Sequence, residues 1–283
     1  MLGRALMARL AQEQNVEAVG LCHSRTGAGL VPCDLSDIDS IGPLLDRFQP
    51  DAIIHTAAIR DPDEFAADVS LARRLNVEST AAIARWTAAH PGAFMAYMSS
   101  DYVFNGTKAP YAVTDPLAPA NSYGQSKADG EVVVRDTCAN SAAILRVPIL
   151  WGDVETLAES SVTKVLATVL KRAPAVVDDW AVRYPTHVAD VADILTQIVQ
   201  RHLAGTFHWS SLEPLTKYDM AMIDAELAGV DPTLFSRSGA PANGSEPRPK
   251  DCHLDRSALE ALGVTTPGIL YRDQVRKLLA RFA

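Results

Sequence analysis

The alternation of short apolar runs with helical patterns is the feature that most restricts how this chain can fold. Strand-like runs occupy residues 16–22, 30–35, 51–58, 93–100 and 142–150, and helical patterns occupy residues 36–48, 64–89 and 122–137. Runs that are apolar on both faces and separated by helices are typical of a parallel sheet covered on both sides. The sequence therefore predicts an α/β fold with a doubly wound, Rossmann-like parallel sheet over residues 1–150.

The pattern changes after residue 150. Helices are predicted at 157–172, 188–202 and 216–229, with a strand at 206–211 and two short helical segments at the end of the chain. The Gly-, Pro- and Ser-rich stretch 236–250 predicts a loop. We expect residues 151–283 to form mainly a smaller C-terminal lobe for a substrate or partner, with some segments returning to the main sheet.

Charge and composition exclude several function classes. The net charge is −8, which argues against nucleic-acid binding as a main role. No apolar run is long enough to cross a bilayer and no signal peptide pattern is visible, so we expect a cytoplasmic protein without a membrane partner. The four cysteines are widely spaced and form no C-x-x-C pair, which favours reduced, buried thiols over disulfides or a metal site.

The segment YGQSK, residues 123–127, carries the clearest chemical signal. Its ends are four residues apart, so Tyr123 and Lys127 share one face of a helix. A cation beside a tyrosine favours the phenolate and brings proton exchange with an alcohol or carbonyl within reach. Any exposed helix can hold this pair, so the pattern needs support from its context.

That support comes from Ser99 and Ser100, which end an apolar strand upstream. Ligands of open α/β sheets bind at the carboxyl ends of the strands. Ser100 could therefore bind a substrate oxygen beside Tyr123, although both serines could instead satisfy the backbone of a turn.

Other strand ends carry candidate cofactor residues. The small residues in HTAA, 55–58, allow a cofactor to approach the backbone, and Asp34 follows another strand. Arg25 follows the run 16–22, where an arginine accommodates the 2′-phosphate of NADP in dinucleotide-binding folds. NADP is therefore favoured over NAD, with a solvated surface arginine as the alternative.

Long motifs resemble a known family. SSDYVFNGTKAPY, PLAPANSYGQSKADGE and RPKDCHLDRSALEALG are similar to extended short-chain dehydrogenase/reductases of the dTDP-4-dehydrorhamnose reductase type. Within that group, RVPILWGDVETLAESSVTKV, DDWAVRYPTHVADVA and GTFHWSSLEPLTKYDMA resemble regulatory β subunits of methionine adenosyltransferase. Ser100 departs from the threonine usual in the reductases and still supplies a hydroxyl.

The resemblance implies roles by position. The triad of a reductase would be Ser100, Tyr123 and Lys127, with Tyr123 donating a proton while nicotinamide delivers hydride. It implies structural roles for His187 and Trp209, and Arg248 would either guide a nucleotide sugar or close the lobe. The predicted NADP site comprises Gly3, Arg25, Asp34, Leu35, Thr56, Ala57, Ala58, Arg60, Ser99, Tyr123, Lys127 and Leu150.

The start of the chain, MLGRALMARL, enters a helical pattern directly at Gly3. The family begins with an apolar strand running into G-x-x-G-x-x-G, and Gly3 matches only its last glycine. We expect the first strand to be absent from this chain, which would leave runs 16–22 and 51–56 facing a gap with unpaired backbone groups. We therefore expect weak NADP binding and poor folding of this chain as written.

Two functions follow from the resemblance. One is an NADP-binding regulatory protein that docks on a methionine adenosyltransferase catalytic subunit in S-adenosylmethionine synthesis. The other is an NADPH-dependent oxidoreductase that reduces a 4-keto nucleotide sugar. The triad is present under both, so its presence leaves open whether the chain is an enzyme.

Overall fold

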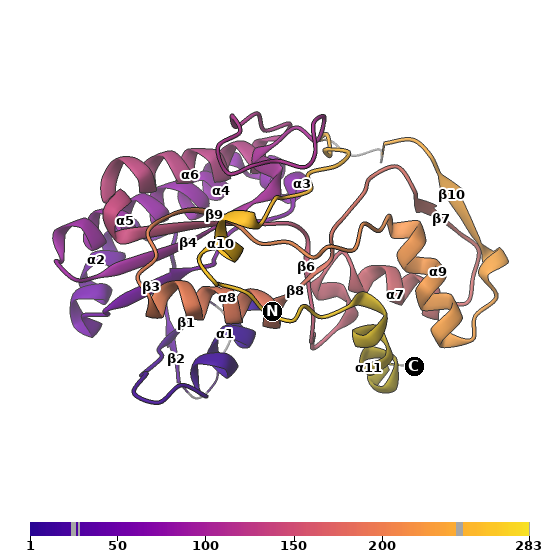
Figure 1. Ribbon diagram of the computed structural model, residues 1–283, viewed down its shortest axis with the longest axis horizontal. Helices are drawn as coiled ribbons and strands as arrows, with labels where there is room; N and C mark the ends of the chain where they lie inside the picture. Colours follow the sequence, from indigo (N-terminus) through magenta and orange to yellow (C-terminus); the bar gives the residue numbers. More distant parts are fainter. Residues whose placement is uncertain (24–26, 28, 242–245, 283) are drawn as a thin grey trace.

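The computed structural model describes residues 1–23, 27, 29–241 and 246–282 (Figure 1). Its α-helices are α1 (Leu2–Leu10), α2 (Ile38–Phe48), α3 (Pro62–Ala67), α4 (Val69–Arg73), α5 (Ser79–Ala89), α6 (Ser122–Cys138), α7 (Thr163–Leu170), α8 (Val188–Gln200), α9 (Lys217–Ala228), α10 (Ser257–Ala261) and α11 (Tyr271–Phe282). Its strands are β1 (Gly20–Cys22), β2 (Leu30–Pro32), β3 (Ala52–His55), β4 (Phe94–Ser100), β5 (Ala142–Val147), β6 (Leu150–Trp151), β7 (Ala175–Asp178), β8 (Thr186–His187), β9 (Gly205–His208) and β10 (Phe235–Ser238).

The main sheet has the strand order β3-β4-β5-β9, and its neighbouring strands are all parallel. Every residue of β4 and β5 is buried, as the continuous apolar runs predict for a covered parallel sheet. The predicted strand 142–150 is interrupted after Val147. Pro148 follows there, and a proline supplies no N–H for the ladder. The α/β prediction is confirmed.

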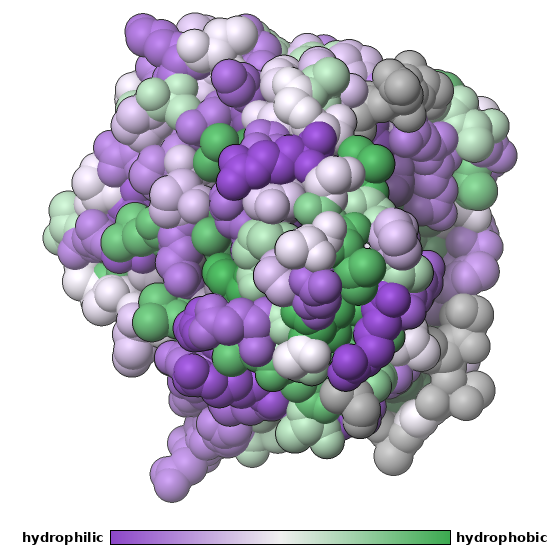
Figure 2. Space-filling model, turned by 90° about the vertical axis from the view of Figure 1, so that its right-hand side faces the viewer, coloured by the Kyte–Doolittle hydropathy of each residue, from purple (hydrophilic) through white to green (hydrophobic). Residues whose placement is uncertain are grey.

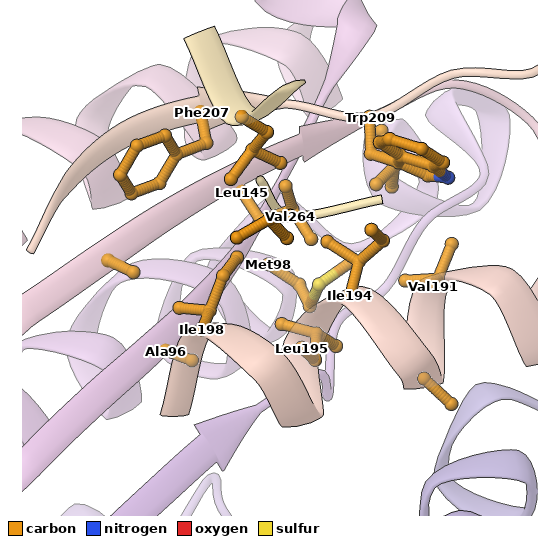
Figure 3. Close-up of a cluster of buried hydrophobic side chains, with 14 of the residues drawn as sticks. Ala96, Met98, Leu145, Val191, Ile194, Leu195, Ile198, Phe207, Trp209 and Val264 are labelled. Carbon is orange, nitrogen blue, oxygen red and sulfur yellow. The ribbon is translucent and has the colours of Figure 1, made fainter. Parts of the chain in front are cut away.

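Helices cover both faces of this sheet. On one face α1, α8 and α10 pack against β4, β5 and β9, and Figure 3 shows Leu145, Phe207 and Ile194 meeting in that core. On the other face α2, α5 and α6 pack against the same sheet (Figure 1). Alternate side chains of β4 point to opposite faces of the sheet. Met98 lies in the core beneath α8, and Tyr97 lies in the core beneath α5 and α6.

The sheet is broken where the first strand was predicted to be absent. In the described part of the chain β1 pairs with β2 only, and β3 pairs with β4 only. Leu21, in the middle of β1, is 44% exposed, and the first three residues of β3 are only half-buried. Helix α1 lies beside the break, with Met7 against Gly20 and Leu6 in the core. Among the described residues, β1 and β3 therefore each have one edge without a strand partner.

The prediction of one continuous helix over 64–89 is wrong. It divides into α3, α4, a π-helix over Arg74–Glu78, and α5. Asp68 ends α3 and caps α4 by accepting a hydrogen bond from Leu71 N. An aspartate competes for backbone hydrogen bonds in this way and favours a new helix start.

The smaller lobe has a separate core built from α7, α9, α11, β7 and β10 around Trp151. The loop predicted over 236–250 is wrong at its start, because β10 continues to Ser238 and pairs with β7. Figure 2 views the molecule from this lobe and shows apolar surface among polar side chains. Helix α8 packs in the core of the main sheet, and strand β9 pairs with β5 in that sheet.

Two further observations concern environment. No helix in the described residues combines the length and apolar character needed to cross a membrane. All four cysteines are free; Cys138 and Cys252 are buried, whereas Cys22 and Cys33 are half-buried, so the prediction of burial holds for two of them.

Candidate functional site

The three predicted catalytic residues come from two neighbouring elements. Ser100 is the last residue of β4, and Tyr123 and Lys127 lie on α6, which packs against that strand and the turn after it. Helix α6 begins at the N-cap Asn121, whose side chain accepts a hydrogen bond from Gly124 N at 2.8 Å. Gly124 is required here, because a Cβ would lie 3.0 Å from the carbonyl carbon of Tyr102 and closer still to its oxygen.

Burial opposes ionisation of both proton-exchange groups. Burial raises the pKa of Tyr123, while Ser100 and the charge of Arg60 partly oppose that change. Burial lowers the pKa of Lys127 to about 7, and Glu131 opposes this shift. Burial therefore outweighs the lowering effect of a neighbouring cation on the pKa of Tyr123, so the phenolate that the sequence argument invoked is not favoured here. A neutral phenol can still donate a proton to a substrate oxygen.

Lys127 rests on a buried aromatic ring. Its Nζ lies 4.2 Å from the centre of the Tyr97 ring, a cation–π contact. Tyr97 is fully buried, and Gly130 makes room for it, since a Cβ there would lie 2.8 Å from Tyr97 Cζ and closer still to Oη. The glycine in the SKADGE segment thus sets the position of the ring beneath the lysine.

A buried ionic network joins α6 to β4 and β5. Glu131 is fully buried and accepts from Ser99 Oγ at 2.6 Å and from Arg146 Nε and Nη2 at 2.8 and 2.7 Å. Burial raises the pKa of Glu131, but hydrogen bonds from Arg146, Ser99 and Arg135 outweigh it and hold the pKa below its ordinary value. Arg146 also contacts His208 Nε2 at 3.1 Å. The Ser99 hydroxyl therefore takes part in this network.

Asp101 adds a carboxyl group beside the triad that the sequence reasoning missed. It is buried and accepts from Ser100 Oγ at 3.0 Å. Burial raises the pKa of Asp101 to about 7, with the charge of Arg183 and the bond from Ser100 opposing the shift. A carboxyl that titrates near neutral pH next to the Ser100 hydroxyl can hold or release a proton there.

The predicted cofactor segment after β3 forms a loop over residues 56–60. Asn76 holds this loop, because its side chain accepts from Ile59 N and donates to Ile59 O, both at 2.9 Å. The same amide donates to Ser126 Oγ on α6 at 3.0 Å. Asn76 lies in the π-helix, and the sequence reasoning missed it. Arg60 is exposed and donates to the backbone oxygen of Glu159.

The other predicted cofactor residues lie at separate strand ends. Asp34 follows β2 and accepts from Ser36 N and Oγ, which lowers its pKa. Leu35 packs into the core under α2, and half-buried Leu150 begins β6. Gly3 lies in the first turn of α1 with open space around it, and Arg25 falls outside the described residues.

Cations gather where the smaller lobe meets the triad. Burial lowers the pKa of Lys217, the first residue of α9, and the charges of Arg183 and Arg248 act in the same direction, against Asp178. Arg183 is buried and lies over the Tyr102 ring, 6.0 Å from its centre. Tyr102 in turn meets Tyr123 edge-on, with ring centres 6.0 Å apart. This arrangement suits an anionic group held near Tyr123.

His187 and Trp209 both make structural contacts. His187 accepts from Ala189 N at 3.2 Å as the N-cap of α8. Trp209 is buried in the core against α8 (Figure 3). Within the described residues, no group of three His, Cys, Asp or Glu side chains is arranged to hold a metal ion.

Comparison with known proteins places this geometry in a family. The chain is 40% identical over 271 residues to methionine adenosyltransferase 2 subunit beta of Rattus norvegicus, covering 93% of this chain and 80% of that protein. It is 30% identical over 274 residues to dTDP-4-keto-6-deoxy-D-glucose reductase of Streptomyces niveus, covering 94% and 88%. The fold matches a dTDP-4-dehydrorhamnose reductase of Bacillus anthracis in complex with NADP, with a TM-score of 0.80, 22% identity, and 99% and 95% coverage. The family described as RmlD substrate binding domain matches residues 1–283, and the chain belongs to that family.

Proposed function

We propose that this protein is an NADP(H)-binding regulatory subunit that docks on a methionine adenosyltransferase catalytic subunit. The observation that carries the proposal is the 40% identity to a subunit beta across 93% of this chain. The likeness extends through the smaller lobe as well as the sheet, so it includes the parts that differ most from a bare dinucleotide-binding domain.

Co-purification tests the docking directly. Mixed with a methionine adenosyltransferase catalytic subunit at micromolar concentration, the protein should co-elute in size-exclusion chromatography and change the kinetics of S-adenosylmethionine synthesis. The reductase of Streptomyces niveus serves as the control with a related fold. Separate elution together with unchanged kinetics would contradict the proposal.

The proposed cofactor is NADP(H) rather than NAD(H). The residues that support it are those at the strand ends, with loop 56–60 held next to α6 by Asn76. The sequence predicts that Arg25 contacts the 2′-phosphate. Calorimetry should give a lower Kd for NADPH than for NADH, and Arg25→Ala should reduce that difference. Equal affinities in the unmodified protein would remove the basis for the NADP assignment.

The second candidate is reduction of a 4-keto nucleotide sugar with NADPH. Two observations favour it. Ser100 and Tyr123 interact at the carboxyl end of β4, and the Arg183 guanidinium lies over the Tyr102 ring, which meets the Tyr123 ring edge-on. Tyr123 would donate the proton to the carbonyl oxygen while NADPH supplies hydride to the carbon. Lys217 and Arg183 would bind the diphosphate of the substrate.

An assay of NADPH oxidation with dTDP-4-keto-6-deoxyglucose tests this candidate. Tyr123→Phe should abolish turnover, whereas Tyr97→Phe should retain it, because the Tyr97 hydroxyl lies in the core. Lys217→Met should raise the KM for the nucleotide sugar and leave the Kd for NADPH unchanged. Turnover that survives Tyr123→Phe would rule out that residue as the acid.

A further inference from the structure

A strap formed by residues 246–251 returns from the smaller lobe to the side of the molecule that holds the predicted site. Figure 1 shows the chain after residue 246 passing close to α3 and continuing to α10. The strap contacts α3, α6 and the turn after β4, all of which are far from it in the sequence. Its bonds to them are made by side chains as well as by the backbone.

The first contact of the strap is with the start of α6. Glu246 accepts from Ser122 N at 3.1 Å and from Ser122 Oγ at 2.9 Å. Asn121, the N-cap of α6, donates to Pro247 O at 2.9 Å. A carboxylate is favourable at a helix N-terminus because it meets unpaired N–H groups there. The strap therefore fixes the turn of helix that carries Tyr123.

The second contact is with the start of α3. Arg248 Nη2 lies 2.9 Å from Asp63 Oδ2 and 3.4 Å from Asp61 Oδ1. Glu246 N donates to Asp63 Oδ1 at 3.2 Å, and Asp61 is the N-cap of α3. Asp61 directly follows Arg60, so this contact fixes the end of the loop predicted to line the cofactor.

The third contact is with the turn that follows Ser100. Asp251 N donates to Gly106 O at 3.4 Å. Gly106 has a φ of +77°, and a Cβ there would lie 2.6 Å from Lys250 N and 2.8 Å from Pro249 Cβ. The backbones of the strap and the turn are therefore in direct contact, and a side chain at residue 106 would separate them.

We propose that the strap is a positioning element that holds the cofactor loop and the start of α6 together, and so controls the release of NADP(H). Glu246 and Arg248 are its two positioning residues, acting through Ser122 and Asp61 on the neighbours Tyr123 and Arg60. The proposal rests on the NADP(H) binding proposed above. It assigns Arg248 to a link between elements rather than to direct contact with a nucleotide sugar.

The ion pairs of Arg248 with Asp61 and Asp63 determine how much the strap contributes to stability. Asp61 and Asp63 are about half exposed, with side chains 55% and 45% accessible, and exposed ion pairs contribute little to global stability. Loss of the strap contacts should therefore change opening of the site more than unfolding of the chain. If the strap only stabilised the smaller lobe, the variants would change the Tm and leave the rate of NADPH release unchanged.

The test uses Arg248→Met and Glu246→Ala in the full chain, with Arg272→Met as the matched control. Arg272 pairs with Glu226 on the smaller lobe, so its loss removes a similar exposed ion pair elsewhere. NADPH release is followed by the fluorescence change on displacement with excess NADP. Each strap variant should release NADPH about three to ten times faster than the unmodified protein, and the control should not.

Hydrogen exchange of the protein without cofactor separates this proposal from the proposed function. Both strap variants should exchange faster in peptides covering residues 57–66 and 119–126, with a Tm close to that of Arg272→Met. Unchanged hydrogen exchange in both peptides would overturn the proposed role of the strap. Faster exchange with an unchanged rate of NADPH release would also overturn it. If the unmodified protein binds no NADPH, the proposed function and the control of release both fail, and the exchange data alone decide whether the strap couples α3 to α6.

Discussion

Gly130 and Tyr97 give the sharpest test of how α6 is held against the sheet. In Gly130→Ala the new methyl group would lie 2.8 Å from Tyr97 Cζ and closer still to Oη. Tyr97 is fully buried beneath Lys127, so the ring has no free space to enter. Either α6 or the ring must move.

The magnitude follows from two opposing effects. Overpacking a buried site costs about 1–3 kcal/mol, while replacing a glycine inside a helix by alanine gains up to about 1 kcal/mol. We therefore expect Gly130→Ala to lower the free energy of unfolding by about 1–2 kcal/mol. Gly3→Ala is the control, because Gly3 lies in α1 with nothing within 4 Å of its Cβ position, and it should cause no loss.

Tyr97→Phe supplies the second arm of the experiment. Tyr97 Oη is buried and makes no hydrogen bond of ordinary geometry among the described residues, so its removal alone should be nearly neutral. Combined with Gly130→Ala it removes the closest clash and should restore about 1 kcal/mol. Chemical denaturation of the four proteins measures this coupling. Gly130→Ala with the stability of Gly3→Ala, or a double variant with no recovery, would refute the packing argument.

The remaining predictions concern other buried contacts. Burial raises the pKa of Asp224 to about 7, although a hydrogen bond from Tyr271 opposes the rise. The pKa in the folded protein is therefore higher than the unfolded pKa of about 4. The contribution of Asp224 to the free energy of unfolding is complete below about pH 4 and is lost as the pH rises through about 7. Asp224→Asn should flatten this part of a plot of Tm against pH between 4 and 8. Glu131→Gln should cost about 3–5 kcal/mol in denaturation experiments, because Arg146 stays buried without its counter-charge, and replacing both residues by apolar ones should cost less. Gly106→Ala should accelerate exchange in the strap, and protection equal to the unmodified protein would show that the backbone contact adjusts freely.

Local patterns were sufficient to predict the main sheet and the residues at its carboxyl end. Strand β4 is an apolar run that ends in Ser99 and Ser100, and Tyr123 lies in the first turn of α6, whose N-cap is Asn121. Each of these signals lies within a few residues of sequence. The family resemblance added the roles, which no local pattern supplied.

Contacts between distant segments were not predictable in the same way. Glu131 and Arg146 each resemble an ordinary surface charge in the sequence, and only the packing of α6 on β5 buries them together. Asn76 reaches Ser126 across 50 residues. The bond between Ser122 and Glu246 spans 124 residues and starts in a segment read as a loop. A single sequence records no trace of such pairs, because each member alone satisfies the local rules of its own element.

The break in the sheet shows how local and distant information combine. Reading Gly3 as the last glycine of a longer motif predicted unpaired edges on two particular strands, and β1 and β3 have those edges in the described structure. Leu21 is 44% exposed on β1, whereas every residue of β4, which has strand partners on both sides, is buried. A designed apolar strand joined ahead of Leu2 by a G-x-x-G loop should pair with both edges. It should then raise both the Tm and the affinity for NADPH, since each backbone hydrogen bond gained adds about 1 kcal/mol. If calorimetry and thermal melts of the extended protein match those of the present chain, the exposed edges do not limit its folding or its cofactor binding.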